Sequence, residues 1–331
     1  MTRRRQRPGP EHMSELDYIP INVATLMPSS TAGLDLYQTE PSTGEFFLYR
    51  GADYPLAAQD LGRLRQRGVR QLYIARESHN RYQKYLRQIA TAKPDDDRIS
   101  MPARVAAMNE VVRDVLSRSL VSENTQEAVT AASHLGTVIT HTVTSSAFAV
   151  DDLLRVLNHD FTTFTHSANV AFYIGILANG LGFSRDDVEQ ISTGGLLHDL
   201  GKLEISEAIL SKPGRLDEAE YREIKKHPLV GFRRLALRPE LNFGQLMTVY
   251  QHHERIDGQG YPVGCEGDEI HMWAKLCAVV DVYEALTSQR PYRQAMSSDK
   301  ALEILNRDSG KAFDPEILAC WNSIIRNSCS P

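Results

Sequence analysis

The 331-residue sequence predicts two parts of different fold class, an α+β N-terminal module followed by an all-α helical bundle. Alternation of apolar and polar residues, which is typical of strands, occurs only before about residue 76. From Ile99 onward apolar residues recur three and four positions apart, as in amphipathic helices. A proline and three successive aspartates in AKPDDDR (92–98) indicate a solvated connection between the two parts.

The first part begins with a basic segment, residues 1–16, which we expect to be a disordered arm before a small α+β module at 17–95. In that module, LDLYQ (34–38) and EFFLYR (45–50) flank the turn-forming EPSTG and predict a hairpin. LAAQDLGRLRQRG has helical spacing up to Gly68, and VRQLYIA follows as a short returning strand. The sequence contains no phosphate-binding glycine motif, so we expect a regulatory or docking role, with a signalling protein as partner.

The composition excludes some classes of protein. The net charge of −5 argues against a polymeric nucleic acid as partner, although a small phosphate-binding pocket is compatible with it. The four cysteines form no CxxC pair, which indicates a reducing compartment. Since no window approaches the roughly 20 apolar residues of a spanning helix, we expect a cytoplasmic protein without a membrane partner.

The helical part opens with residues 99–142, which predict a connector. We expect this connector either to pack on the helical bundle or to pair two copies into a homodimer.

The segment LLHDLGK places His198 and Asp199 together after an apolar helical run, with Lys202 one turn later. Imidazole and carboxylate groups suit divalent metals, and a carboxylate can bridge two ions, so Asp199 is the natural bridge. A hydrogen bond at the helix end is the alternative explanation of this pair.

Other histidines and an aspartate strengthen the metal hypothesis. His166 and His227, taken singly, are also explained as ordinary surface histidines of amphipathic helices. His252 and His253, however, are adjacent at the end of an apolar run, where two imidazoles are costly without a partner. Asp281 lies inside the apolar helix AKLCAVVDVYEAL, so it needs a cation, an arginine or a helix N-terminus nearby.

Two further segments could contact a ligand. In DGQGYP (257–262), Gly258 and Gly260 permit backbone conformations that bring a loop close to a ligand, although an ordinary glycine-rich turn has the same composition. In RPYR, Arg290 and Arg293 could offer guanidinium groups to phosphate oxygens or lie in a solvated turn.

The ordered set of His166, HDLGK, His227-Pro228, HHERIDGQGYP, Asp281 and RPYR resembles the HD-GYP family of cyclic di-GMP phosphodiesterases over residues 145–325. The resemblance implies an HD-superfamily helical bundle as the catalytic domain. It also implies that the metals are bound by His166, His198, Asp199, His227, His252, His253 and Asp281. By the same resemblance Asp199 and Lys202 take part in catalysis, while Lys202, Tyr261, Arg290, Arg293 and the loop glycines Gly258 and Gly260 contact the substrate.

This sequence departs from some family members at Thr162, where they hold a third metal with a glutamate. We therefore expect two divalent ions, with iron or manganese favoured by the resemblance and zinc, nickel or cobalt compatible with the same ligands. Two ions can share a hydroxide and neutralise a phosphate oxygen, which would open cyclic di-GMP to pGpG and in a further step to GMP. A hydrolase of another nucleotide and a catalytically weak dinucleotide sensor or docking protein are the alternatives.

Overall fold

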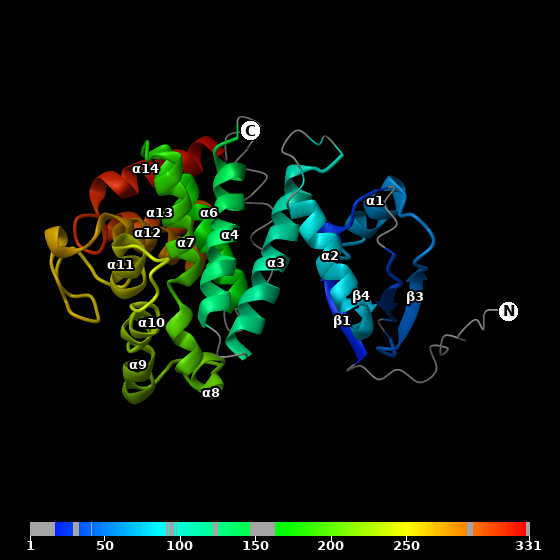
Figure 1. The fold of residues 1–331 in the computed structure, drawn as a ribbon, viewed down its shortest axis with the longest axis horizontal. Helices are drawn as coiled ribbons and strands as arrows, with labels where there is room; N and C mark the ends of the chain where they lie inside the picture. The colour runs from blue at the N-terminus through cyan, green and yellow to red at the C-terminus, as the bar shows by residue number, and fades with distance from the viewer. Residues whose placement is uncertain are drawn as a thin grey trace. The chain divides into compact units, whose positions relative to one another are not determined.

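The computed structural model describes residues 17–28, 33–40, 42–90, 92, 96, 98–121, 125–145, 163–289 and 294–328 (Figure 1). The chain divides into two compact units, Met1–Val111 and Val112–Pro331. The division lies within α3 (Met101–Val121), a helix of the segment that the sequence predicts as a connector. A small sheet-containing unit followed by a helical one confirms the predicted fold class.

The first unit contains a four-stranded antiparallel sheet in the order β1-β4-β2-β3. Its strands are β1 (Tyr18–Asn22), β2 (Leu36–Thr39), β3 (Phe46–Arg50) and β4 (Gln71–Ala75). The pairing of β2 with β3 confirms the predicted hairpin, and β4 is the predicted returning strand. This strand crosses back to pair with β1, with Tyr18 opposite Ala75.

Strand β1 was not identified from the sequence, where it belongs to a mixed pattern. It contains Pro20, which has no backbone N–H to donate to a neighbouring strand. Because β1 lies at the edge of the sheet, only one of its sides is paired, and such positions tolerate proline.

Two helices complete the hydrophobic core of the first unit. They are α1 (Ala58–Gln66), within the segment predicted to be helical, and α2 (His79–Ala90). Leu64 of α1 and Leu86 of α2 are buried, as are Leu72 and Ile74 of β4. The alternation of exposed and buried residues along β4 matches a sheet with one covered face.

In its described residues the second unit consists of helices joined by loops that contain two isolated β-bridges, and Figure 1 shows its helices from green to red. After α3 come α4 (Thr125–Val143), α6 (Thr163–Gly180), α7 (Arg185–Leu197), α8 (Glu207–Leu210), α9 (Glu218–Ile224), α10 (His227–Leu235), α11 (Phe243–Gln251), α12 (Met272–Thr287), α13 (Ser298–Arg307) and α14 (Pro315–Ser328). Helix α6 packs against α4, α7 and α12, and α7 also packs against α11. Residues 168–178 of α6 are all buried, which explains why this stretch, ANVAFYIGILA, is almost entirely apolar.

Capping side chains set where the helices of this unit begin. The Ser184 side chain accepts a hydrogen bond from Asp187 N at the start of α7, and the Asn242 side chain accepts one from Gln245 N at the start of α11. Pro228 occupies the first turn of α10, where its missing N–H would have no partner in the helix. This proline therefore begins a helix rather than breaking one.

The sequence also led to expectations about membrane spans, cysteines and the N-terminal arm. Among the described residues, no helix combines the length and the apolar character needed to cross a membrane. Cys265, Cys277 and Cys320 are free thiols. The predicted arm at 1–16 and Cys329 lie outside the described residues.

Candidate metal and active site

Five helices bring the predicted ligands to one place in the second unit. His166 lies on α6, His198 caps the end of α7, and Asp199 precedes the short 3-10 helix Leu200–Glu204. The other positions are the first residue of α10, the end of α11 and the middle of α12, which carry His227, His252 with His253, and Asp281. The seven side chains form three overlapping groups, and within each group the possible ligand atoms lie within 4.8 Å of one another.

The cluster is buried. His198 and His227 are fully buried, and Asp199 and Asp281 are only 3% and 7% exposed. His253 is the most accessible ligand, with 23% of its side chain exposed. Burial of two carboxylates at this depth is costly unless positive charge compensates it.

Asp199 directs one carboxylate oxygen to each side of the cluster. Its Oδ2 lies 3.5 Å from Nε2 of both His166 and His198. Its Oδ1 lies 3.2 Å from Nε2 of His227 and 3.8 Å from Nε2 of His252. A carboxylate placed between two sets of imidazoles can offer an oxygen as a metal ligand on either side.

Backbone carbonyls orient three of the imidazoles. The Nδ1 atoms of His198, His227 and His252 lie 2.7, 2.7 and 2.9 Å from the carbonyl oxygens of Gly195, Ile224 and Val249. A carbonyl oxygen can only accept, so each Nδ1 carries the proton and each Nε2 presents its lone pair to the cluster. This is the usual arrangement of metal-binding histidines, in which the outer nitrogen is held by a second partner.

The lone pairs that result fit a metal and are poorly placed without one. Nε2 of His227 lies 3.1 Å from Nε2 of His252, so two acceptors face each other. Nε2 of His198 and Oδ1 of Asp199 are buried and have no hydrogen-bond partner. Buried polar atoms normally have partners, and cations between these atoms would provide them. The residues present therefore fit a metal centre.

The electrostatics also favour the forms that bind metal. Burial lowers the pKa of His198 and His252 and brings the pKa of His253 to about 3. Burial opposes ionisation of Asp199 and Asp281, but the charge of Lys202 and the hydrogen bond from His166, respectively, hold the pKa of each carboxyl well below its usual range. At neutral pH the site thus offers two ionised carboxylates and neutral imidazoles at His198, His252 and His253.

His166 is held differently, by a carboxylate that the sequence analysis did not identify. Its Nδ1 lies 2.5 Å from Oε2 of Glu284, a buried residue one turn after Asp281 on α12. Burial disfavours the charged ring, but Glu284 and Asp281 outweigh it and raise the pKa of His166 to about 10. A second carboxylate in the same apolar helix was the sequence signal, since residues three apart share a helix face.

Glu284 is itself held in place. Asn169 Nδ2 donates to its Oε1 over 2.9 Å, and Ser288 Oγ donates to the same oxygen over 2.5 Å. A carboxylate with these partners can orient an imidazole and increase its strength as a ligand. We therefore regard Glu284 as a positioning residue for His166.

Gly201, in HDLGK, allows two backbone segments to meet. A Cβ at this position would lie 2.0 Å from the carbonyl oxygen of His227 and 2.6 Å from the amide nitrogen of Gly231. Only glycine fits there without displacing the start of α10, and hence the His227 ring that faces Asp199.

The predicted glycine loop lies beside the cluster. Gly258 has a φ of +72°, and a Cβ on Gly260 would lie 2.5 Å from Glu254 Cα, so both positions require glycine. Glu254 was not identified as important, but its buried carboxylate accepts backbone N–H groups of the loop, including that of Val263 over 2.7 Å. The Tyr261 ring stacks on His253 with centroids 4.7 Å apart.

Lys225 extends this aromatic wall. Its Nζ lies 4.7 Å from the ring centroid of Tyr221 and 5.4 Å from that of Tyr261. Neither Lys225 nor Tyr221 stands out in the sequence, because both belong to an ordinary charged helical stretch. Their position next to the ring that covers His253 is visible only in three dimensions.

Of the basic residues predicted to contact the substrate, the structure describes only Lys202. Lys202 Nζ donates to Oδ2 of Asp199 over 2.5 Å, so this lysine holds the carboxylate that lies between the two sets of imidazoles. Its side chain is 23% exposed and thus still reaches the surface of the site. Arg290, Arg293 and Thr162 lie outside the described residues.

Comparison with known proteins agrees with this geometry. A family model described as HD domain matches residues 152–317, which is half of the chain. The 3'3'-cGAMP-specific phosphodiesterase 3 of Vibrio cholerae is 42% identical over 161 residues, or 48% of this chain and 35% of the relative. The cyclic di-GMP phosphodiesterase response regulator RpfG of Xanthomonas campestris is 40% identical over 154 residues, or 46% and 40%.

A longer match extends into more of the chain. The cyclic di-GMP phosphodiesterase PA4108 of Pseudomonas aeruginosa is 34% identical over 190 residues, or 57% of this chain and 46% of the relative. The matched part therefore spans less than half the length of each of these curated relatives.

A solved structure shares the fold. The HDG"Y"P protein Bd1817 from Bdellovibrio bacteriovorus matches with a TM-score of 0.65 and 19% identity over 94% of this chain and 100% of that one. At this identity the likeness concerns architecture only. The family model, the curated relatives and the motif order together show that the chain belongs to the HD domain family, in its HD-GYP branch.

Proposed function

We propose that the second unit is a metal-dependent phosphodiesterase that hydrolyses a cyclic dinucleotide. The observation that carries this proposal is the convergence of seven buried or half-buried histidine and aspartate side chains, with the two oxygens of Asp199 facing opposite sides of the cluster. Relatives that act on cyclic di-GMP or on 3'3'-cGAMP by name support the substrate class. We propose cyclic di-GMP as the substrate and pGpG as the first product.

We further propose that the centre holds two divalent ions, iron or manganese. One ion would be held by His166, His198 and Asp281. The other would be held by His227, His252 and His253, and Asp199 lies between the two sets of ligands. When bound, such ions make water a better nucleophile and neutralise a phosphate oxygen. Elemental analysis of protein purified without oxygen tests this proposal, and one ion per chain would contradict it.

Lys202 would assist the reaction at that centre in two ways, through its charge and through its protons. Lys202 keeps the Asp199 carboxylate in place through its 2.5 Å hydrogen bond and adds positive charge at the edge of the site. Positive charge next to the phosphoryl group stabilises the negative charge that develops as the P–O bond breaks. The departing ribose oxygen must also gain a proton, a step in which Lys202 could assist at its Nζ.

The wall formed by Tyr221, Lys225 and Tyr261 would receive the nucleotide. Aromatic faces stack on nucleobases, and a cation held over the rings can contact a phosphate oxygen. The wall begins at Tyr261, whose ring lies on His253, so a ligand against it is next to the cluster. This arrangement favours an extended, anionic and aromatic substrate over a simple phosphate ester.

The deciding experiment compares turnover of cyclic di-GMP, 3'3'-cGAMP, pGpG and GMP by purified protein supplied with each metal. Under our proposal both cyclic dinucleotides, or cyclic di-GMP alone, are cleaved, and Asp199→Ala abolishes cleavage while the fold is retained. Binding without turnover with every metal would favour the alternative of a dinucleotide sensor or docking protein. Preferential cleavage of mononucleotides would favour a different hydrolase.

The wider partners stay predictions. A signalling protein bound by residues 17–95 and a homodimer formed through residues 99–142 are tested by the oligomeric state in solution and by binding measured with and without the first unit. The predicted catalytic domain at 145–325 contains every described residue of the cluster.

A further inference from the structure

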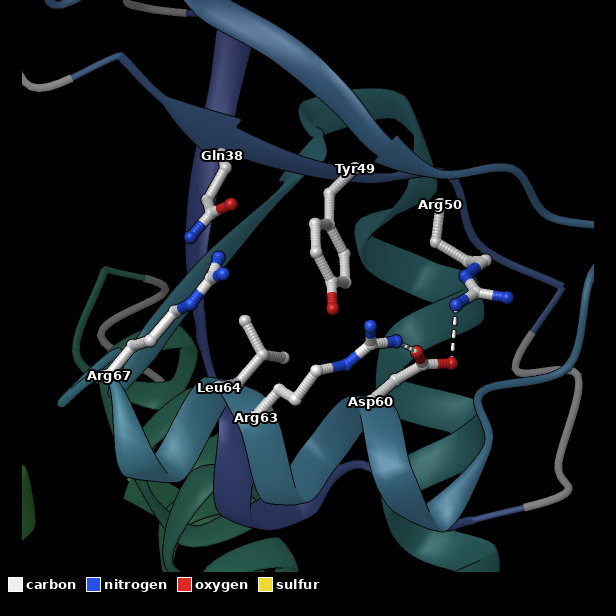
Figure 2. A pocket seen from close by; sticks show the side chains of 7 residues that line it. All are labelled: Gln38, Tyr49, Arg50, Asp60, Arg63, Leu64 and Arg67. Atoms are coloured by element: carbon white, nitrogen blue, oxygen red, sulfur yellow. Dashed lines mark hydrogen bonds and ion pairs between the residues drawn. The ribbon is translucent and has the colours of Figure 1, made fainter.

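The first unit contains a pocket of about 240 Å³ that is rich in arginine. It is lined by Gln38, Tyr49, Arg50, Asp60, Arg63, Leu64 and Arg67, and Figure 2 shows these side chains around it. The polar residues come from β2, β3 and α1, so the pocket lies between the β2–β3 hairpin and one face of a helix. Leu64 is buried and supplies apolar surface to the lining.

Asp60 fixes two of the arginines. Its carboxylate, which is nearly buried, accepts hydrogen bonds from the guanidinium groups of Arg50 and Arg63, and from Ala57 N over 3.1 Å. Both of its oxygens are thus already in use, while each guanidinium has five N–H donors. Arg50 and Arg63 keep donors available for a further acceptor, and their positions are set in advance.

Arg67 adds a charge that is not balanced. It follows Arg63 by four residues, directly after the last residue of α1, and it makes no ion pair with any residue in the described part of the chain. Three arginines against one aspartate leave two positive charges at the pocket. Like charges one turn apart repel each other, so an anion between them would be favourable.

The remaining lining residues can also donate hydrogen bonds. In Figure 2 the Tyr49 hydroxyl points into the pocket, and the Gln38 amide lies near the guanidinium of Arg67. An ion-pair network that stabilises the start of α1 explains Arg50, Asp60 and Arg63. It does not explain why Arg67, Tyr49 and Gln38 face the same cavity.

We propose that this pocket binds the phosphate or pyrophosphate group of a small phosphorylated molecule. Guanidinium groups match phosphate oxygens in a paired, planar geometry, and a doubly charged phosphate would balance the two uncompensated charges. The cavity is large enough for such a group and smaller than a typical pocket for a whole drug-sized ligand, which is about 300–1,000 Å³. The rest of the ligand would therefore extend beyond the pocket.

The test is calorimetric titration of the full chain with inorganic pyrophosphate, GDP and acetate at low and at moderate salt. The variants are Arg67→Gln and Arg65→Gln. Both change one arginine at the C-terminal end of α1 to the same residue, Arg65 inside the helix and Arg67 directly after it, but Arg65 does not line the pocket. Because binding is the readout, the result does not depend on whether the second unit hydrolyses a dinucleotide.

Pyrophosphate or GDP is expected to bind at one site, with an affinity that falls as the salt concentration rises. Arg67→Gln is expected to lower this affinity about tenfold, whereas Arg65→Gln leaves the affinity unchanged. Tighter binding of GDP than of pyrophosphate would identify a nucleotide as the source of the phosphate group. Tighter binding of pyrophosphate would identify the bare anion. Acetate binding equal to that of pyrophosphate, or equal affinity in wild type and Arg67→Gln, would overturn the proposal, because the anion would then not be recognised as a phosphate or would bind elsewhere.

Discussion

Glu284 accepts a hydrogen bond from His166 Nδ1 over 2.5 Å, and the two residues are 118 positions apart in the sequence. This contact joins α6 to α12 next to the predicted ligands His166 and Asp281. It also leaves the Nε2 atom of His166 directed at Asp281, 3.0 Å away.

Replacing Glu284 by alanine is expected to weaken metal binding by about 10–100-fold, because outer partners of ligating histidines contribute effects of that size. Glu284→Gln can still accept the hydrogen bond and should recover part of the loss. Metal affinity by competition with a chelating dye, measured together with turnover at saturating metal, separates positioning from a direct role in catalysis.

Glu303→Gln provides the control for this series, since Glu303 lies on the surface of α13 and pairs with Lys300. It should leave both quantities unchanged. If Glu284→Ala bound metal as tightly as the wild type, our assignment of Glu284 as a positioning residue would be wrong.

Gly201→Ala is expected to lower the free energy of unfolding by about 1–3 kcal/mol, because overpacking against fixed backbone has costs in that range. The added Cβ would meet the carbonyl oxygen of His227 at 2.0 Å and push the start of α10 away from Asp199. We expect reduced metal content together with reduced stability, measured by urea denaturation and elemental analysis.

Gly62→Ala is the matched control of opposite sign. Gly62 lies inside α1, and a Cβ there would meet nothing within 4 Å. Alanine should raise the stability by about 0.5–1 kcal/mol, since glycine is unfavourable in a helix interior. Equal effects of the two substitutions would show that the contact between Gly201 and His227 is not restrictive.

Lys225→Met is expected to raise KM for the cyclic dinucleotide with little change in kcat. The substitution keeps the aliphatic stem but removes the charge that lies over Tyr221 and Tyr261 and that, in our proposal, contacts a phosphate oxygen; a hydrogen bond to a charged group is worth about 1.5–3 kcal/mol, or roughly a 10–150-fold change. Lys226→Met is the control, because Lys226 pairs with Glu223 on the exposed surface. A fall in kcat alone would exclude a role in binding.

The metal-free protein should lose stability as the pH falls from about 6.5 toward 3, with His253 as one contributor. Burial brings the pKa of His253 down from 6.5 to about 3 in the folded state. Between these values the unfolded chain binds a proton at this residue and the folded chain does not, so each unit of acidification costs up to about 1.4 kcal/mol. Urea denaturation of wild type and His253→Asn at pH 7 and pH 5 measures the difference.

In His253→Asn the loss of stability between the two pH values should be smaller than in the wild type. An identical loss in both proteins would mean that His253 titrates in the folded state as it does in the unfolded chain.

The sequence predicted the fold class because periodicity reflects burial. Strand-like alternation ends near residue 76, and from Ile99 onward the helical spacing of apolar residues is matched by helices in the described residues. Strand β1 was missed because Pro20 obscures its pattern, and only its edge position in the sheet makes that residue acceptable.

For the site, the cost of burying charge was informative. Asp281 in an apolar helix and the His252-His253 pair indicated a cluster, and the structure brings them together with the other predicted ligands. Glu284 is equally buried and was overlooked, because its importance comes from its contact with His166. Gly201 was quoted only as part of a motif, since a close approach of two backbones leaves no trace in composition.

The position of Asp199 limits how the site can vary. If the centre holds two ions, as we propose, any shift of this single carboxylate that suits an ion on one side would draw an oxygen away from the ion on the other. The choice of metal on one side of the cluster is therefore more readily altered by a substitution at His166 or at His227. Each of these histidines belongs to a single ligand group, whereas Asp199 is shared by two.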